Sequence, residues 1–180
     1  RLQTGDVPEL FKISRVKMLF KKGEKSDMLN YRPLAMSSHL GKLWERVVNN
    51  HLMDFLEENK KLSARQFGFR RGMGTTENLI SLHEHVIDRL EAEKCKIEVW
   101  NFDLRKAFDK LDHAKVLQLL KNCGVSGFLG LSIENWLTNR RQFVEVGNSK
   151  SDETVVGRSC VQGSVLGPTL WLLYIQSLTS

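Results

Sequence analysis

Apolar residues in this chain are spaced in two different ways, and the change of spacing predicts where strands give way to helices. Residues 1–36 carry short apolar clusters separated by basic and turn-forming residues, which is typical of two extended segments joined by a loop. Beyond this part, apolar residues recur every three or four positions, which predicts a helix over 39–59 capped by Ser37 or Ser38. A second run of the same kind predicts another helix over 79–90.

The second half of the chain returns to strand-like patterns. β-Branched and aromatic residues over 96–104 predict a buried strand that leads into an aspartate. A helix follows, with Asp112 as its cap and Gly124 as its stop. The run "RQFVEVGNSKSDETVV" predicts a β-hairpin, and "QGSVLGPTLWLLYIQSL" predicts a glycine loop that leads into an apolar helix. Helices and strands are mixed without regular alternation, which favours the α+β fold class.

Composition sets limits on the class of protein. The chain has 180 residues and 41% hydrophobic residues, which is typical of a globular domain. Lys and Arg outnumber Asp and Glu by 27 to 21, for a net charge of +6. This basic excess suits a polyanionic partner but is common in other proteins. No apolar run approaches the length of a membrane span, so we expect no membrane partner.

The cysteines and histidines do not form a metal-binding pattern. Cys95, Cys123 and Cys160 are far apart and lack any C-x-x-C spacing, so neither a disulfide framework nor a zinc site follows. A reducing compartment is the simpler expectation for such a chain. His83 and His85 lie within the second predicted helix, and we interpret them as solvated helix residues.

The candidate chemistry lies in "NFDLRKAFDKLDH", which holds three aspartates in thirteen positions. Asp103 ends the predicted strand, and a carboxylate there needs a partner, either a divalent cation or a salt bridge. At ~3.3 Å per residue, a continuing strand would separate Asp103 from Asp109 by about 20 Å. Mg²⁺ binds oxygen at roughly 2.1 Å, so these two could not share one ion in that geometry. Asp103 is the candidate metal ligand and Asp112 the helix cap, while spacing alone leaves a salt-bridged Asp103 equally open.

"FDLRKAFDKLDH" resembles motif A of reverse transcriptases, specifically those of non-LTR (LINE-type) retrotransposons. Further stretches resemble other family segments in the family's order and cover most of the chain: "LFKKGEKSDMLNYRPLAMSSHLGKLWERVV", "LSARQFGFRRGMGTTENL", "WLTNRRQFVEVGNSKS" and, for motif B, "VQGSVLGPTLWLLYIQSL". The resemblance implies a right-hand polymerase fold of the reverse-transcriptase type. It assigns residues 1–94 to a fingers-like subdomain and residues 95–180 to a partial palm that carries motifs A and B.

The resemblance also implies an activity, RNA-directed DNA polymerisation. Asp103 would bind both catalytic Mg²⁺ ions, for which Mn²⁺ can substitute, and the Leu104 carbonyl would help to hold one of them. The substrates would be an RNA template, a DNA primer and deoxynucleoside triphosphates. The two cations would lower the pKa of the primer 3′-hydroxyl and neutralise the leaving pyrophosphate. Phe108 would pack under the sugar and exclude a ribose 2′-hydroxyl; without the resemblance it would be interpreted as a core residue.

Motif B supplies further nucleotide-site candidates. Gln162 and Gly163 match the family pair that lines the nucleotide and template site. The chain departs from the family at Val161, where proline is usual. A serine-hydrolase interpretation of Ser164 fails because the Gly-x-Ser-x-Gly spacing is absent.

Basic side chains provide the remaining candidates, because Lys offers a point charge and Arg a hydrogen-bonding fork to phosphate. By resemblance, one set contacts the incoming triphosphate: Lys21, Lys22 and Arg32. A pair beside several glycines could hold the template backbone: Arg70 and Arg71. A third set could extend a nucleic-acid track, although a solvated face is its default interpretation: Arg140, Arg141 and Lys150. Each of these is an ordinary surface residue when taken alone.

The sequence lacks part of the expected machinery. The family supplies a second carboxylate in an aromatic-x-Asp-Asp hairpin after motif B, and this chain has no Asp-Asp pair. It begins with Arg rather than Met, so we expect a piece of a longer protein, inactive on its own. The alternative is a catalytically inactive remnant that at most binds nucleic acid. A weaker one is a metal-dependent nuclease that uses Asp103, Asp109 and Asp112.

Overall fold

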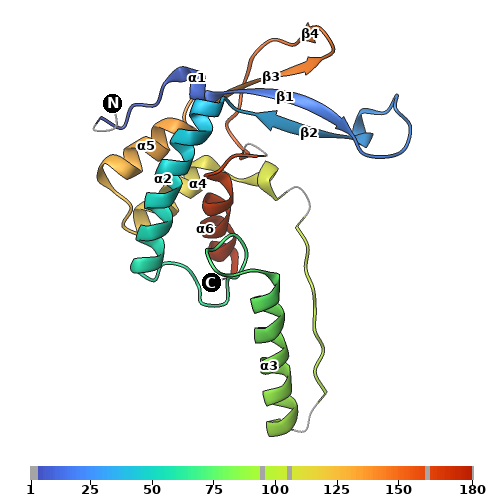
Figure 1. The fold of residues 1–180 in the computed structure, drawn as a ribbon, viewed down its shortest axis with the longest axis vertical. Coiled ribbons are helices and arrows are strands. Elements are labelled where there is room, and N and C mark those ends of the chain that lie inside the picture. Colours follow the sequence, from blue (N-terminus) through green and yellow to red (C-terminus); the bar gives the residue numbers. More distant parts are fainter. Residues whose placement is uncertain (1–3, 94–95, 105–106, 161–162, 180) are drawn as a thin grey trace.

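The computed structural model describes residues 4–93, 96–104, 107–160 and 163–179, and it combines one mixed sheet with a group of packed helices (Figure 1). Cys95, Val161 and Gln162 lie outside the described residues. The elements in chain order are α1 (Glu9–Lys12), β1 (Ile13–Phe20), η1 (Met28–Asn30), β2 (Tyr31–Met36), α2 (His39–Glu58), α3 (Thr75–Glu93), η2 (Phe108–Lys110), α4 (His113–Asn122), α5 (Gly127–Leu137), β3 (Arg141–Val146), β4 (Ser149–Lys150), β5 (Thr154–Val155) and α6 (Gly167–Thr179).

The sheet joins strands from the two ends of the chain. β1 and β2 form an antiparallel hairpin in which Leu19 faces Arg32. β1 also pairs in parallel with β3, where Ile13 faces Arg141, and β3 pairs with β4 and β5 in antiparallel directions. The strand order is β2-β1-β3-β4. The predicted hairpin after Arg141 is confirmed, and the two extended segments predicted within residues 1–36 are confirmed as β1 and β2. The mixture of helices with a mixed sheet agrees with the α+β class.

The core lies between α2, α4, α5 and α6, below the sheet in Figure 1. The predicted caps explain where two of these helices begin. The Ser38 hydroxyl accepts a hydrogen bond from the Gly41 amide at 3.0 Å, and the Asp112 carboxylate accepts one from the Lys115 amide at 3.1 Å. Ser37 does not cap α2. Of the described helices, none combines the length and the apolar character needed to cross a bilayer.

The buried face of α2 differs from the one that its apolar residues suggest. Leu40, Leu43 and Val47 are at least 40% exposed. The residues that α2 buries are Gly41, Glu45, Val48, Leu52, Met53 and Leu56. Apolar side chains cover two faces of this helix, and the packed face carries a glutamate.

The prediction of a buried strand over 96–104 is wrong. α3 extends away from the helical group, and residues 96–104 run back beside it as an extended segment (Figure 1). A strand forms through hydrogen bonds to a neighbouring strand, and this segment has no such partner among the described residues. Trp100 is 74% exposed and Phe102 90% exposed, so the segment is not buried either. The helix predicted over 79–90 is confirmed as part of α3, although its apolar side chains are also largely exposed.

The predicted boundary between residues 94 and 95 stays a prediction. The sheet draws β1 and β2 from before this point and β3, β4 and β5 from after it. The core likewise combines α2 with α4, α5 and α6. The two proposed subdomains therefore share one sheet and one core.

Candidate active site

The segment that resembles motif A is hydrogen-bonded to the residues directly before the segment that resembles motif B. The Phe108 carbonyl accepts a bond from the Cys160 amide at 2.8 Å, and the Leu111 carbonyl accepts one from the Ser159 amide at 2.9 Å. The His113 ring adds a contact, with Nε2 at 2.8 Å from the Ser159 carbonyl oxygen. These bonds hold η2 against the chain that leads into the Gly163 loop.

Phe108 lies in a cluster of aromatic rings. Its ring centre is 6.3 Å from that of Phe69 and 5.8 Å from that of Trp171. The side chain is half-buried and packs against the hydrophobic core. The cluster fixes the ring in place and leaves part of its surface accessible, so the role under a nucleotide sugar stays a prediction.

The loop before α6, residues 163–166, is held by a glutamate that the sequence analysis missed. Glu45 is fully buried, and its Oε2 accepts hydrogen bonds from the Ser164 hydroxyl at 2.6 Å, the Val165 amide at 2.7 Å and the Leu166 amide at 3.3 Å. One oxygen of this side chain therefore serves three donors of the loop. The available signal was its position, since residue 45 shares a helix face with Val48 and Leu52.

Two glycines shape this loop and its junction with α6. Gly163 has a φ of +91°, a conformation that residues with a side chain rarely adopt, and a Cβ built on it would lie 3.7 Å from the Ala35 carbonyl oxygen. A Cβ built on Gly167 would overlap the Cys160 sulfur. The loop therefore runs beside β2 and against the segment that binds Phe108.

Arg140 does not belong to a surface track, which corrects one of the interpretations above. It is only 3% exposed, and it donates to the Ser14 hydroxyl at 3.3 Å and the Trp136 carbonyl at 3.4 Å. Burial lowers the pKa of its guanidinium, while the nearby Cys160 and Glu45 act in the opposite direction. Its donors face the protein interior rather than solvent.

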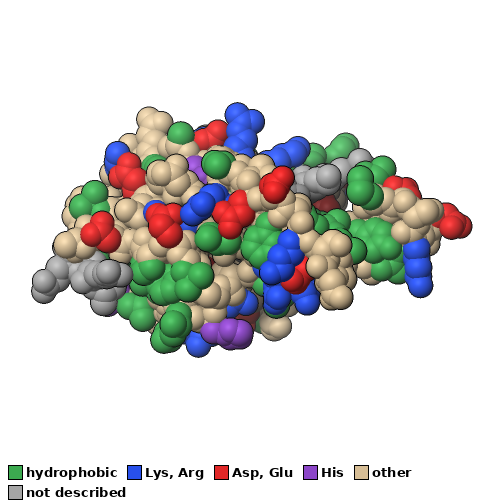
Figure 2. Space-filling model, turned by 90° about the horizontal axis from the view of Figure 1, so that it is seen from above, with side chains coloured by type: hydrophobic (Ala, Val, Ile, Leu, Met, Phe, Trp, Pro, Cys, Tyr) green, Lys and Arg blue, Asp and Glu red, His purple; other side chains and the backbone are tan. Residues whose placement is uncertain are grey.

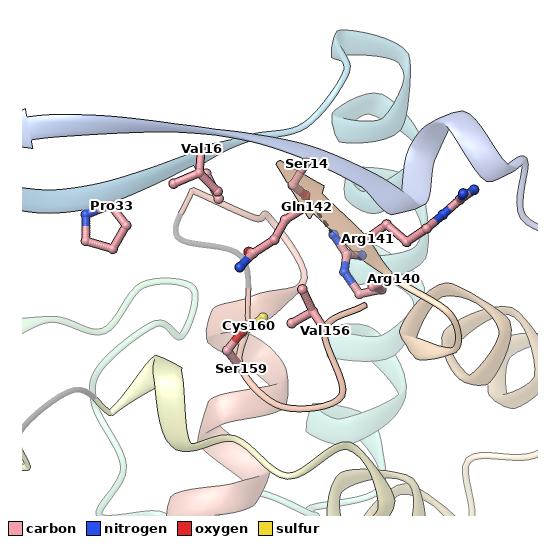
Figure 3. Close-up of a pocket in the computed structure, with 10 residues that line it drawn as sticks. Ser14, Val16, Pro33, Arg140, Arg141, Gln142, Val156, Ser159 and Cys160 are labelled. Atoms are coloured by element: carbon pink, nitrogen blue, oxygen red, sulfur yellow. Dashed lines mark hydrogen bonds between the residues drawn. The ribbon is translucent and has the colours of Figure 1, made fainter. Parts of the chain in front are cut away.

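A cavity of about 280 Å³ lies between the sheet and the segment that precedes the loop (Figure 3). Val16, Pro33 and Gln142 line it from β1, β2 and β3, and Cys160 lines it from below. Arg140 and Ser14, joined by the dashed line in Figure 3, close one side. None of the predicted nucleotide-binding residues that the structure describes lines this cavity.

The structure brings the three predicted triphosphate ligands to one end of the β1–β2 hairpin. Lys21 follows β1 directly, its amide bonds to the Asn30 carbonyl at 2.8 Å, and Lys22 is next to it. Arg32 lies one position into β2, opposite Leu19. All three basic side chains are exposed, and among the described residues they form no ion pair. Their charges are available to an anionic ligand.

The two arginines predicted to hold template differ from each other. Arg70 forms a forked pair with Glu57, at 2.8 and 2.6 Å, and also donates to the Ser63 and Gln66 carbonyls. Its side chain is 9% exposed, so it acts as a structural clamp in this structure. The Arg70 hydrogen bond is the main cause that lowers the pKa of Glu57. The Arg71 side chain is 61% exposed and pairs with Asp54 at 2.7 Å.

The described residues do not assemble a complete metal site. Asp103 is exposed on the extended segment, and no group of three His, Cys, Asp or Glu side chains in the described part of the chain could hold an ion. The Asp112 carboxylate is occupied as the cap of α4, which weakens the nuclease interpretation. His83 and His85 are exposed on α3, as expected for solvated residues.

Basic and acidic side chains are interspersed on the end of the molecule that carries the sheet (Figure 2). They alternate there with apolar patches rather than forming one continuous basic surface. A net charge of +6 is therefore not concentrated on this face.

Comparisons with known proteins identify the family. A family model described as reverse transcriptase (RNA-dependent DNA polymerase) matches residues 21–180. The probable RNA-directed DNA polymerase from transposon BS of Drosophila melanogaster is 33% identical over 95% of this chain and 19% of that protein. The RNA-directed DNA polymerase from mobile element jockey of the same species is 30% identical over 98% of this chain and 19% of that protein.

A third relative is the retrovirus-related Pol polyprotein from type-1 retrotransposable element R2 of Popillia japonica, 28% identical over 98% of this chain and 24% of that protein. The chain thus spans about a fifth of the length of the curated relatives it matches, 19% for the first two. The family model covers most of the chain, and the relatives align with nearly all of it. The chain therefore belongs to the reverse transcriptase family, and it is homologous to the RNA-directed DNA polymerases of non-LTR retrotransposons, as its motifs predict.

Proposed function

We propose that this chain is the fingers and part of the palm of an RNA-directed DNA polymerase, which copies an RNA template onto a DNA primer from deoxynucleoside triphosphates. The observation that carries the proposal is the 2.8 Å bond between the Phe108 carbonyl and the Cys160 amide. It joins motif A to the residue directly before motif B, and a nucleotide would have to contact both motifs together. The family match over residues 21–180 supports the same activity.

Three features of the site suit an incoming nucleotide. The exposed charges of Lys21, Lys22 and Arg32 at the hairpin end would bind the triphosphate. The half-buried ring of Phe108 would contact the sugar, and the backbone at Gly163, where no side chain intervenes, would face the base pair together with Gln162. Arg71 would touch the template backbone, whereas the internal bonds of Arg70 favour a supporting role.

The family generally uses divalent metal ions. We assign Asp103 and the Leu104 carbonyl as ligands of Mg²⁺, or of Mn²⁺ as a substitute, with the other carboxylates supplied from outside the described residues. Two bound cations would activate the primer 3′-hydroxyl and neutralise the pyrophosphate. Because the described residues do not assemble such a site, the 180-residue chain alone should not extend a primer.

The test uses the protein encoded by the complete open reading frame that contains these residues. Primer extension on an RNA template is compared for the wild type, Asp103→Asn and Asp88→Asn, a control at an exposed aspartate of α3. We expect Asp103→Asn to reduce the rate by at least about 100-fold and Asp88→Asn to leave it within about twofold. Extension by Asp103→Asn at the control rate would refute the assignment of Asp103.

A further inference from the structure

Glu45 buries a carboxylate on the packed face of α2. Among the buried residues of α2, Glu45 carries a charge whereas Val48 and Leu52 on the same face are apolar. Burying a carboxylate costs free energy unless its oxygens are satisfied by donors. The buried carboxylate faces the loop at the start of motif B.

Within the part of the chain that the structure describes, the hydrogen-bond donors to Glu45 come from that loop. Its Oε2 receives the Ser164 hydroxyl and the amides of Val165 and Leu166, and the Ser164 oxygen in turn accepts the Gly167 amide at 3.0 Å. Glu45 thereby satisfies, directly or through Ser164, the amides that lead into the first turn of α6. A negative charge at this end of α6 also interacts favourably with the helix dipole.

A second contact fixes α6 independently of Glu45. Thr169 donates its hydroxyl to the Asn49 amide oxygen at 2.6 Å, and Asn49 lies one helical turn after Glu45 on α2. Buried side chains of α6, including Leu170 and Leu173, add apolar packing. The helix would therefore stay docked without Glu45, whereas the loop before it would lose its anchor.

The Glu45 anchor also affects Gly163, a predicted nucleotide-site residue. This residue directly precedes the anchored serine and lies beside the β2 carbonyl of Ala35. The other oxygen of Glu45, Oε1, is buried and has no hydrogen-bond partner among the described residues. A residue selected only for stability would not be expected to bury an unpaired oxygen. Such unsatisfied polar atoms are accepted where function requires a group.

We propose that Glu45 is a positioning residue of the nucleotide site: its carboxylate holds the motif B loop so that the Gly163 backbone meets the incoming nucleotide. The inference rests on the proposed polymerase function. The anchor acts on a loop that contacts substrate rather than on the reacting atoms. Loss of the anchor should therefore weaken nucleotide binding more than it slows the chemical step.

The experiment uses the complete protein and three variants. Glu45→Gln keeps the shape but replaces the charge, Asn49→Ala removes the second contact, and Glu58→Gln is the matched control at an exposed glutamate of the same helix. Each is measured for KM of deoxynucleoside triphosphate, kcat, and amide hydrogen exchange in peptides that cover residues 163–170 and α5. We expect Glu45→Gln to raise KM about five- to tenfold with kcat within about threefold, and to speed exchange in 163–170 alone.

Other outcomes overturn the inference. An unchanged KM in Glu45→Gln, with or without faster loop exchange, would show that the anchor does not serve the nucleotide. Faster exchange throughout the chain, α5 included, would make Glu45 an ordinary core residue. A KM increase in Asn49→Ala equal to that in Glu45→Gln would assign the effect to α6 docking instead. A wild-type protein that extends no primer would overturn the proposed function, while the exchange comparison would still decide whether Glu45 anchors the loop.

Discussion

The guanidinium of Arg140 lies over the indole ring of Trp136, 4.1 Å from its centre, in a buried position where α5 meets the sheet. A cation over an aromatic face is stabilised by the ring quadrupole, most strongly where water is excluded. The same charge also offsets the buried Glu45 carboxylate, which acts on the pKa of Arg140. One arginine thus joins the end of α5 to β1 through Trp136 and Ser14.

Replacing this arginine should destabilise the fold. Arg140→Ala removes the cation from Trp136 and the hydrogen bonds to Ser14 and the Trp136 carbonyl, so we expect a loss of about 3 kcal/mol in the free energy of unfolding. Urea unfolding of the 180-residue chain measures it. Arg141→Ala is the control, because its ion pairs with Glu9 and Glu153 lie at the surface and should contribute at most about 1 kcal/mol. Equal effects of the two variants would contradict the role of Arg140.

The Glu57–Arg70 clamp predicts a pH dependence of stability. The Arg70 hydrogen bond lowers the pKa of Glu57 below its ordinary value of 4.5, against an opposing effect of burial. A lowered acid pKa stabilises the fold above the unfolded value, and this contribution disappears as the pH falls through the lowered pKa. We expect wild type to exceed Glu57→Gln in stability at neutral pH by up to about 1 kcal/mol, since the pair is partly exposed.

The measurement is urea unfolding of both proteins at neutral pH and at about pH 3. The difference between them should shrink at the lower pH. Glu58→Gln, without this clamp, serves as the comparison. A difference that stays constant or grows on acidification would exclude the clamp as its source.

The contact between Gly167 and Cys160 predicts a non-additive pair of substitutions. Gly167→Ala places a methyl group against the Cys160 sulfur, so we expect a loss of about 1–3 kcal/mol from overpacking. Cys160→Ala removes that sulfur, and the double variant should therefore lose less than the sum of the two single variants. A double-mutant cycle by chemical denaturation measures the coupling. Strict additivity would mean that another neighbour, such as Ser164, limits the space.

The position of Phe108 predicts sugar selectivity in the complete enzyme. If Phe108 packs under the sugar as proposed, Phe108→Val removes the ring that would exclude a 2′-hydroxyl, so we expect ribonucleotides to be incorporated more readily. The ratio of kcat/KM for deoxy- and ribonucleotides should fall by about tenfold or more, a difference that one removed steric contact can produce. Phe143→Val, on β3, is the control for general effects of losing an aromatic ring. An unchanged ratio in Phe108→Val would show that Phe108 serves only core packing and does not select the sugar.

Local features of the fold could be predicted from the sequence, because their causes lie within a few residues. The caps at Ser38 and Asp112 and the hairpin of β3 and β4 are examples. The strand predicted over 96–104 was wrong. β-Branched and aromatic residues favour an extended backbone, but a strand also needs a neighbouring strand to hydrogen-bond with. The apolar spacing of α2 placed its helix correctly but not its buried face, since apolar side chains cover both.

Within the candidate site, the sequence indicated the motif residues but not the buried charges that support them. Motif resemblance proposes Asp103, Phe108 and Gly163 as site residues, and the structure bonds Phe108 to Cys160, three positions before Gly163. Glu45 and Arg140 were missed as interior residues because their partners are distant in sequence: the Glu45 bond to Ser164 spans 119 positions. No local pattern distinguishes such a buried charge from a solvated one.

The parallel pairing of β1 with β3 also has a consequence for how the chain folds during synthesis. Ser14 and Arg140, at the start of this pairing, are separated by 126 positions. At ~5–20 residues per second, β3 would leave the ribosome roughly 6–25 s after β1. During this time the β1 edge of the β1–β2 hairpin is unpaired. The charged side chains of Arg15 and Lys17 on β1 would discourage another nascent chain from pairing with this edge in place of β3.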